Sequence, residues 1–199
     1  MSGEIMNIKL INNFLTSNGF SKDNDVNFFR VNNGFLNCIS FQRITTGDVF
    51  FINLGIHPIF DPKDTPSTFK REIDCYIRTR LSTDKRLSVE LFNSSEGISF
   101  VINEIEEKAW HFFDLFSSTN DVFSCLSIDD IKNKNIPEKL NSVTVARLVS
   151  MCVNYHLFNN NVSMAHDFAN YGVCVSGMAI GEKKKFKQIL KNIEKYLLP

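Results

Sequence analysis

The chain has 199 residues, of which 43% are hydrophobic and 22% are charged, a composition typical of a globular protein with a substantial core. Lys plus Arg and Asp plus Glu both number 22, so the net charge is zero and bulk charge gives no reason to expect a nucleic acid or a membrane surface as partner. No stretch approaches the ~20 apolar residues that a membrane-spanning helix needs.

The first predicted elements are a helix and a meander of three strands. Residues 4–17 carry apolar side chains at helical spacing, and Gly19 follows as the expected left-handed end of that helix. Alternation predicts strands over 26–31, 35–44 and 49–56, with turns at 32–34 and 45–48. These strands hold the densest apolar pattern in the chain, so we expect the other elements to cover or extend them.

Alternation along the three strands assigns their side chains to two faces of the predicted sheet. One face is apolar throughout and is expected to be buried: Phe29, Val31, Ile39, Phe41, Phe50, Ile52 and Leu54. The other face mixes apolar and polar side chains: Phe28, Arg30, Ser40, Gln42, Phe51 and Asn53. We expect this mixed face to meet solvent or to line a groove.

The pattern after the meander predicts a loop and two further strands. Three prolines between residues 57 and 70 predict a long loop. Residues 72–81 alternate as a fourth strand, and residues 85–92 are predicted to form a short fifth strand.

From residue 94 onward the apolar spacing becomes helical. The predicted helices cover 94–116, 142–158, 162–174 and 182–197, and Ala165, Ala169 and Gly172 permit close approach to a neighbouring helix. The order predicts an α+β fold with an N-terminal helix, an antiparallel sheet of four to five strands and a mainly helical C-terminal half. We expect a sheet domain over residues 1–140 and a helical C-terminal extension packed on it over 141–199, or else one domain over 1–199.

Several motifs in the first half of the chain are similar to those of a known family. They are Asn18-Gly19-Phe20, Phe28-Phe29-Arg30, Ser40-Phe41-Gln42, Phe51-Ile52-Asn53-Leu54-Gly55 and Ile77-Arg78-Thr79-Arg80-Leu81. Over about residues 8–81 the chain resembles a bacterial family of domains of unknown function, the DUF4304 type. Members usually carry a tryptophan soon after the Arg segment, where this chain has Leu87-Ser88-Val89. The family has no established activity, and the settings of some members in toxin–immunity or defence systems imply a protein-binding role.

One set of polar residues projects from the mixed face and the adjoining predicted strand. Its members are the ligand-binding candidates Arg30, Gln42, Asn53, Arg78 and Arg80. Guanidinium groups beside side-chain amides suit a carboxylate or a phosphate. Alternatively, the arginines pair with acidic neighbours or are simply solvated. His57 is a candidate proton-transfer group near this set, although a lone histidine after a strand is more often a loop residue.

Two further groups in the C-terminal half contain side chains of kinds that bind ligands. The first comprises Cys152, His156, His166 and Cys174, whose spacing is wider than that of zinc sites, so we expect no metal. The second is a lysine-rich helix face between residues 183 and 195, for which solvation is the better interpretation than nucleic-acid binding. We therefore expect no cofactor and no nucleic-acid partner.

Cysteine usage and the start of the chain predict a compartment. The five cysteines are widely spaced without a CxxC pair, and residues 1–20 lack the pattern of a secretory signal. We expect reduced thiols, a cytoplasmic location and no membrane partner.

The motif content bears on catalysis. The chain has no GxSxG, HExxH, GxxxxGK[ST] or GxGxxG motif. Together with the resemblance, this favours a non-catalytic protein-binding module, associated with immunity or defence, that uses the mixed sheet face or the helical hairpins. The alternative is an enzyme or a small-anion binder that works through the five ligand-binding candidates.

Overall fold

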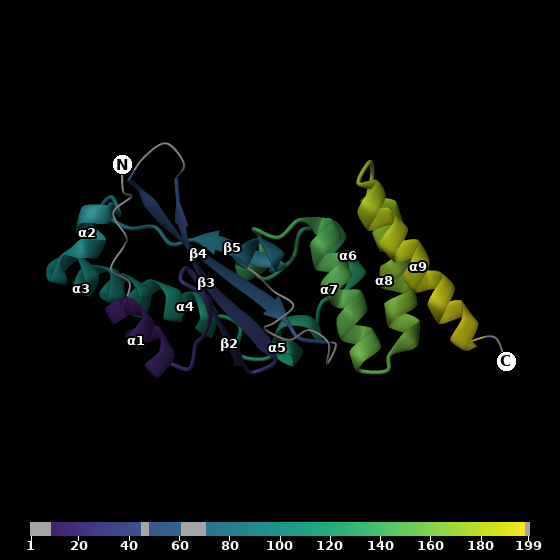
Figure 1. Ribbon diagram of the computed structural model, residues 1–199. Coiled ribbons are helices and arrows are strands. Elements are labelled where there is room, and N and C mark those ends of the chain that lie inside the picture. The colour runs from purple at the N-terminus through teal and green to yellow at the C-terminus, as the bar shows by residue number, and fades with distance from the viewer. Residues whose placement is uncertain (1–8, 45–47, 61–70, 198–199) are drawn as a thin grey trace. The chain divides into compact units, whose positions relative to one another are not determined.

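The computed structural model describes residues 9–44, 48–60 and 71–197, which form two compact units. Unit 1 consists of Met1–Ile59 and Lys63–Ser117, and unit 2 of Phe60–Pro62 and Ser118–Pro199. The architecture is α+β, as predicted: an N-terminal helix, a five-stranded antiparallel sheet and a mainly helical C-terminal half (Figure 1). The predicted division into a sheet domain over 1–140 and a helical extension over 141–199, or into one domain over 1–199, stays a prediction.

The sheet of unit 1 is a meander in which each strand pairs with the next along the chain. Its strands are β1 (Ser21–Asn24), β2 (Asn27–Asn32), β3 (Phe35–Arg43), β4 (Phe50–Pro58) and β5 (Ile77–Arg80). Asn33 and Gly34 make the turn between β2 and β3 with φ of 51° and 79°, the left-handed backbone that these residue types tolerate best. β1 was not predicted because its four side chains are all exposed and show no apolar alternation.

Several predicted element boundaries differ from the observed ones. The observed helix α1 covers Lys9–Ser17, and residues 4–8 of the predicted helix lie outside the described residues, as do 45–47 and 61–70 of the predicted turn and loop. His57 and Pro58, predicted to open that loop, belong to β4. The predicted fourth strand begins only at Ile77, because Glu72–Asp74 forms a 3-10 turn, η2.

The predicted fifth strand over residues 85–92 is wrong. Val89–Asn93 forms helix α2, and the Ser88 hydroxyl caps it by accepting a hydrogen bond from the Leu91 backbone N–H at 3.3 Å. Its link to the sheet is an isolated bridge between Val49 and Ser88. The apolar pattern of this segment is too short to distinguish a helix from a strand, and the Ser88 cap favours the helix.

Pairing between β2 and β3 corrects the predicted sheet faces. Phe28 pairs with Ile39 and Phe29 with Cys38, and directly paired residues project from the same face. The two-residue turn between β2 and β3 pairs even-numbered residues of β2 with odd-numbered residues of β3. The prediction instead placed odd-numbered residues of both strands on the same face. The inner face therefore carries Phe28, Arg30, Ile39, Phe41, Phe50, Ile52 and Leu54, and the outer face carries Phe29, Val31, Ser40, Gln42, Phe51 and Asn53.

Helices of unit 1 cover the inner face of the sheet (Figure 1). Phe92 of α2 meets Phe41 and Phe50, with ring centroids 6.1 Å and 5.0 Å apart. Three segments then follow without a break, namely α3 (Ser95–Glu104), the π-helical turn η3 (Ile105–Ala109) and α4 (Trp110–Asp114). Their buried side chains include Ile98, Val101, Ile105 and Phe113, so this run forms the helical layer of the core.

Part of the outer face is covered by the η2 turn. Phe29, Leu36, Cys38 and Cys75 form a small buried cluster there. Gly55 makes room for it, because a Cβ at that position would lie 2.8 Å from the Cys75 sulfur. The remaining part of the outer face, toward one end of β3 and β4, carries the polar side chains.

Unit 2 is helical. It contains α5 (Thr119–Phe123), α6 (Ile128–Lys132), the 3-10 turn η4 (Glu138–Leu140), α7 (Val145–Phe158), α8 (Val162–Val175) and α9 (Ile180–Leu197). Ala165, Ala169 and Gly172 of α8 are buried, and a Cβ at Gly172 would lie 2.6 Å from the Phe186 ring of α9. The predicted close approach at the small residues of α8 is confirmed.

Candidate functional site

Three of the predicted ligand-binding residues form a hydrogen-bonded row across the outer face. Gln42 comes from β3, Asn53 from β4 and Arg80 from β5. Asn53 Nδ2 donates to Gln42 Oε1 at 2.9 Å, and Arg80 Nε donates to Asn53 Oδ1 at 3.2 Å. Because a guanidinium can only donate, Arg80 fixes the amide orientation of Asn53. We refer to Gln42, Asn53 and Arg80 as the polar ladder.

The polar ladder holds the Arg80 guanidinium in place above an aromatic ring. The guanidinium carbon lies 3.7 Å from the centroid of the Phe51 ring, within the range of a cation–π contact. Arg80 is exposed, whereas Asn53 is buried. Within the described chain, Nε makes the hydrogen bond of Arg80 and the two terminal nitrogens make none. Their N–H groups are therefore available to an anionic ligand.

Arg78 adds a second positive charge beside the polar ladder. It is half-buried and lies two residues before Arg80, so both side chains project from the outer face. Arg78 pairs with Gly55, just as Arg80 pairs with Asn53. Neither arginine forms an ion pair with any described acidic residue. The structure therefore brings four of the five candidates, Gln42, Asn53, Arg78 and Arg80, to one face.

Arg30 is not part of this group, and the prediction that it shares their face is wrong. It lies on the inner face, where its guanidinium carbon is 4.7 Å from the Phe20 ring centroid and 5.1 Å from that of Trp110. Its Nη1 donates to the Asn18 carbonyl at 3.2 Å. Burial lowers the pKa of Arg30, and the nearby Asp114 carboxylate partly opposes that shift. Arg30 thus packs α1, the sheet and α4 together instead of meeting a ligand.

His57 lies on the outer face of β4, beyond the polar ladder. It is buried on β4 and stacks on Tyr76, with ring centroids 4.7 Å apart and ring planes 15° apart. Burial lowers its pKa to about 4, so its ring is neutral at pH 7. It lies four positions from Asn53 along β4, a distance of about 13 Å, but only two positions from Gly55, which pairs with Arg78. Its role as a proton-transfer group near the ligand-binding candidates therefore stays a prediction.

The thiol and imidazole groups of unit 2 do not form a metal site. Cys152 and His156 are buried on α7, where burial raises the pKa of Cys152 to about 12. His156 stacks on Phe168 at 5.3 Å between ring centroids, while Cys174 is exposed on α8. Among the described residues, no three His, Cys, Asp or Glu side chains are placed to hold a metal ion together.

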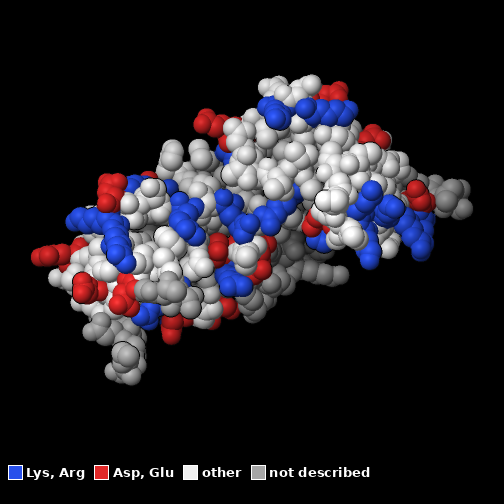
Figure 2. Space-filling model, turned by 90° about the horizontal axis from the view of Figure 1, so that it is seen from above, with Lys and Arg blue, Asp and Glu red and all other residues white. Residues whose placement is uncertain are grey.

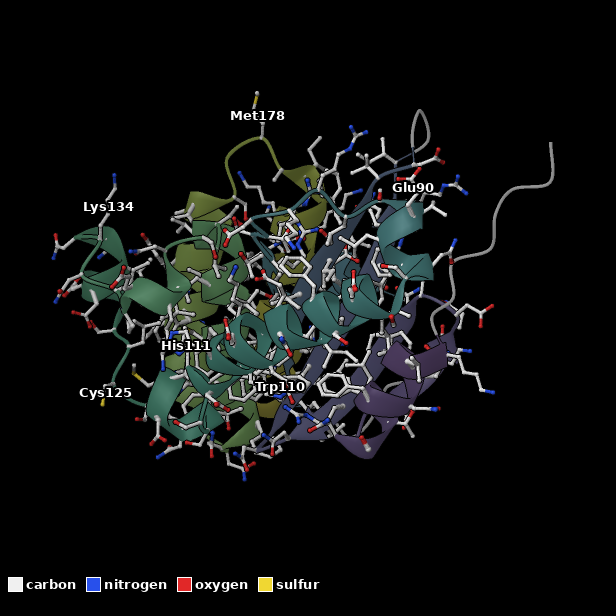
Figure 3. All side chains as sticks on the ribbon, turned by 90° about the vertical axis from the view of Figure 1, so that its left-hand side faces the viewer. Glu90, Trp110, His111, Cys125, Lys134 and Met178 are labelled. Atoms are coloured by element: carbon white, nitrogen blue, oxygen red, sulfur yellow. The ribbon has the colours of Figure 1, made fainter. Side chains whose placement is uncertain are left out.

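The lysine-rich face belongs to α9. Figure 2 shows Lys and Arg side chains gathered on this helix near the C-terminal end of the chain. Lys185 pairs with Glu182 at 3.0 Å, and Lys184, Lys187 and Lys191 are exposed. Met178, in the turn before α9, projects away from the fold and is 97% exposed (Figure 3). A lysine-rich helix face is ordinarily solvated, and we assign no ligand to it.

Phe51 is the site residue that sequence reasoning missed. Alternation placed it on the mixed face, but as an apolar side chain it was not counted among the ligand-binding candidates. In the structure it pairs with Gln42 and supports the guanidinium of Arg80. An aromatic residue two positions from Asn53 on the same strand face is the signal that points to this role.

Comparison with known proteins gives a family but no activity. The family described as "Domain of unknown function (DUF4304)" matches residues 11–115, a span that includes the polar ladder and Arg78. A search of curated proteins and a search of solved structures each find no match. No helix in the described part of the chain has the length and apolar content of a membrane span. Because the match covers more than half of its residues, the chain belongs to the DUF4304 family of domains of unknown function.

Proposed function

We propose that this chain is a non-catalytic binding module. The outer face of its sheet binds an acidic group of a protein partner. The proposal is supported by the two contacts that position the Arg80 guanidinium without a ligand: the hydrogen bond to Asn53 and the cation–π contact with Phe51. A side chain that is already ordered loses little conformational entropy on binding. The free N–H groups of a guanidinium match the two oxygens of a carboxylate.

The surroundings of Arg80 favour binding over catalysis. Within the polar ladder the Asn53 amide both donates and accepts, and the Gln42 carbonyl oxygen accepts. The nearest charged neighbour on this face of β5 is a second arginine, Arg78. His57 is buried, neutral and about 13 Å along the strand from Asn53. Neither an amide nor a guanidinium is suited to exchange a proton near neutral pH.

The charge distribution favours a protein partner over a nucleic acid. The net charge of the chain is zero, and the outer face offers two guanidinium groups beside the polar ladder. Such a small positive area suits one or two carboxylates, whereas nucleic acids require many phosphate contacts. We place the module in the cytoplasm, because its five cysteines are free thiols. Association with immunity or defence stays a prediction from the family resemblance.

A small-anion binder is the second candidate function. Arg78 and Arg80 lie two positions apart on one strand face, so both can reach an ion between them. A free phosphate would use the same N–H groups as a carboxylate. The two functions differ in whether binding needs a macromolecular partner.

Affinity capture with a charge-matched control tests the proposed function. The tagged full chain, its Arg80→Ala variant and its Lys22→Ala variant are each exposed to extract of the source organism, and retained proteins are identified and purified for binding measurements. Lys22 lies on β1, the opposite edge strand of the sheet. We expect a partner whose affinity falls roughly ten- to hundred-fold with Arg80→Ala and is unchanged by Lys22→Ala.

Two results would overturn the proposal. One is a partner that binds the wild-type and Arg80→Ala proteins equally well. The other is turnover of phosphoesters or nucleotides by the purified chain, abolished by Arg78→Ala, which would make it an enzyme acting through the same arginines.

A further inference from the structure

The outer edge of β5 is not paired with any strand in the part of the chain that the structure describes. β5 is the last strand in the sheet order, and its partner is β4 alone among the described strands. The Leu81 N–H donates to the Ile52 carbonyl at 2.9 Å, so the odd-numbered residues of this segment bond to β4. In an antiparallel pair the intervening residues direct their backbone groups away from that neighbour. The N–H and C=O groups of Arg78 and Arg80 therefore face outward.

These outward backbone groups are open to a partner. Within the described chain, no hydrogen bond involves the backbone N–H or C=O of Arg78 or Arg80 on the outer side of β5. Thr79 and Arg80 are exposed and Arg78 is half-buried. An unpaired row of this kind is a template on which an extended segment can add as a further strand.

The side chains at this edge specify the sequence of such a segment. Residues of an added antiparallel strand that pair directly with Arg78 and Arg80 project from the same outer face as the two arginines. Those two residues are separated by one position in the added strand, because β-strand side chains alternate. Acidic residues at i and i+2 would thus each meet one guanidinium, while the residue between them points to the other face.

The same charges disfavour pairing between two copies of this chain. If β5 of a second copy added in antiparallel register, Arg78 of one copy would lie opposite Arg80 of the other. Like charges directly opposite each other destabilise a strand pair. The edge therefore selects an acidic segment over its own copy.

We propose that β5 accepts an extended acidic segment of the partner as an antiparallel sixth strand, with carboxylates at alternating positions on Arg78 and Arg80. This inference rests on the proposed function and adds the conformation and sequence pattern of the recognised segment. The backbone of the segment supplies hydrogen bonds to the edge, and its two carboxylates supply the selectivity.

A peptide titration of the full chain tests this arrangement. The probe is the acetylated, amidated peptide Thr-Glu-Thr-Glu-Thr-Thr, and the readout is NMR measurement of backbone amide exchange and of chemical shifts. At saturation we expect the amides of Arg78 and Arg80 to exchange at least about ten-fold more slowly. The amide of Thr79 already bonds to β4, so its exchange should change much less.

Two control peptides carry the same charge as the probe. One changes the spacing of the glutamates, and the other removes backbone N–H groups. Thr-Thr-Glu-Glu-Thr-Thr has the same composition but places its carboxylates on opposite faces, and we expect roughly three- to ten-fold weaker binding. In the second control, both glutamate amides of the alternating peptide are N-methylated. This removes the N–H groups that bond to the edge and keeps both carboxylates, so we expect binding to be lost.

The possible failures of this inference and of the proposed function give different signals. If the peptides shift the Arg80 Nε–Hε signal without protecting the Arg78 and Arg80 amides, strand addition is wrong and recognition by the arginine side chains stands. Equal binding of the N-methylated peptide also rules out strand addition. If no peptide changes either signal, both strand addition and the recognition of carboxylates by Arg80 are wrong.

Discussion

Asn53 joins the three members of the polar ladder, because it donates a hydrogen bond to Gln42 and accepts one from Arg80. Alternation placed Gln42 and Asn53 on one face, and that prediction is confirmed by the register of β3 and β4. The contact of Asn53 with Arg80 depends on the register in which β4 pairs with β5. These two strands are separated along the chain by a long connection that includes the η2 turn. No local pattern encodes that register, so the sequence could predict the members of the polar ladder but not its hydrogen bonds. The prediction for Arg30 fails for a different reason: the two-residue turn at Asn33 and Gly34 shifts the parity between β2 and β3, and this places Arg30 on the inner face.

His57 should make stability depend on pH. Its pKa is about 4 in the folded chain against the ordinary value of 6.5, so the unfolded state binds more protons between these values. The stabilisation is therefore complete above about pH 6.5 and is lost as the pH falls toward about 4, a decrease of about 3 kcal/mol in the free energy of unfolding. Urea unfolding of the wild type and of His57→Phe, which keeps a ring against Tyr76, measures the difference. Identical pH slopes for the two proteins would contradict this burial effect.

At the scale of elements, periodicity succeeded where segments are long and failed where they are short. The meander, its Asn33-Gly34 turn and the long C-terminal helices follow their apolar patterns. β1 is only four residues long and exposed throughout, so it has no pattern to detect. The segment before α3 has apolar residues that suit either a strand or a helix, and the Ser88 cap settles it as helix.

The packing of α8 on α9 gives a prediction at this scale. Gly172→Ala places a methyl group where three atoms of the Phe186 ring lie within 2.7 Å, so the ring or the helix must move. Overpacking of this kind costs about 1–3 kcal/mol, and the better helix propensity of Ala offsets at most about 1 kcal/mol of it. We expect Gly172→Ala to lower the free energy of unfolding in urea by about 1–2 kcal/mol.

Gly181→Ala is the control for that substitution. Gly181 lies on α9, and nothing is within 4 Å of the position that a Cβ would occupy. This variant should be as stable as the wild type or slightly more stable. Equal stability of the Gly172→Ala and Gly181→Ala proteins would show that α8 and α9 are not tightly packed at Gly172.

At the scale of the whole molecule, the candidate site lies entirely within one compact unit. The family match ends at residue 115 and unit 1 ends at Ser117, so the two nearly coincide. The polar ladder and Arg78 lie inside this span, and the helices from α5 to α9 lie outside it. The fold class followed from the order of helix, strands and helices along the chain. The binding function proposed for the outer face therefore rests on the part of the chain that the DUF4304 family covers.

We propose that the Arg80 guanidinium is a prearranged receptor for a carboxylate. The most direct measurement is an NMR titration that follows the side-chain Nε–Hε signals of the arginines in the full chain as the alternating glutamate peptide is added. We predict that the Arg80 signal shifts saturably, whereas the signals of Arg30 on the inner face and of Arg43, which is paired with Asp48 at 2.7 Å, stay in place. An Arg80 signal that does not move, or that moves no more than those of Arg30 and Arg43, would contradict the claim.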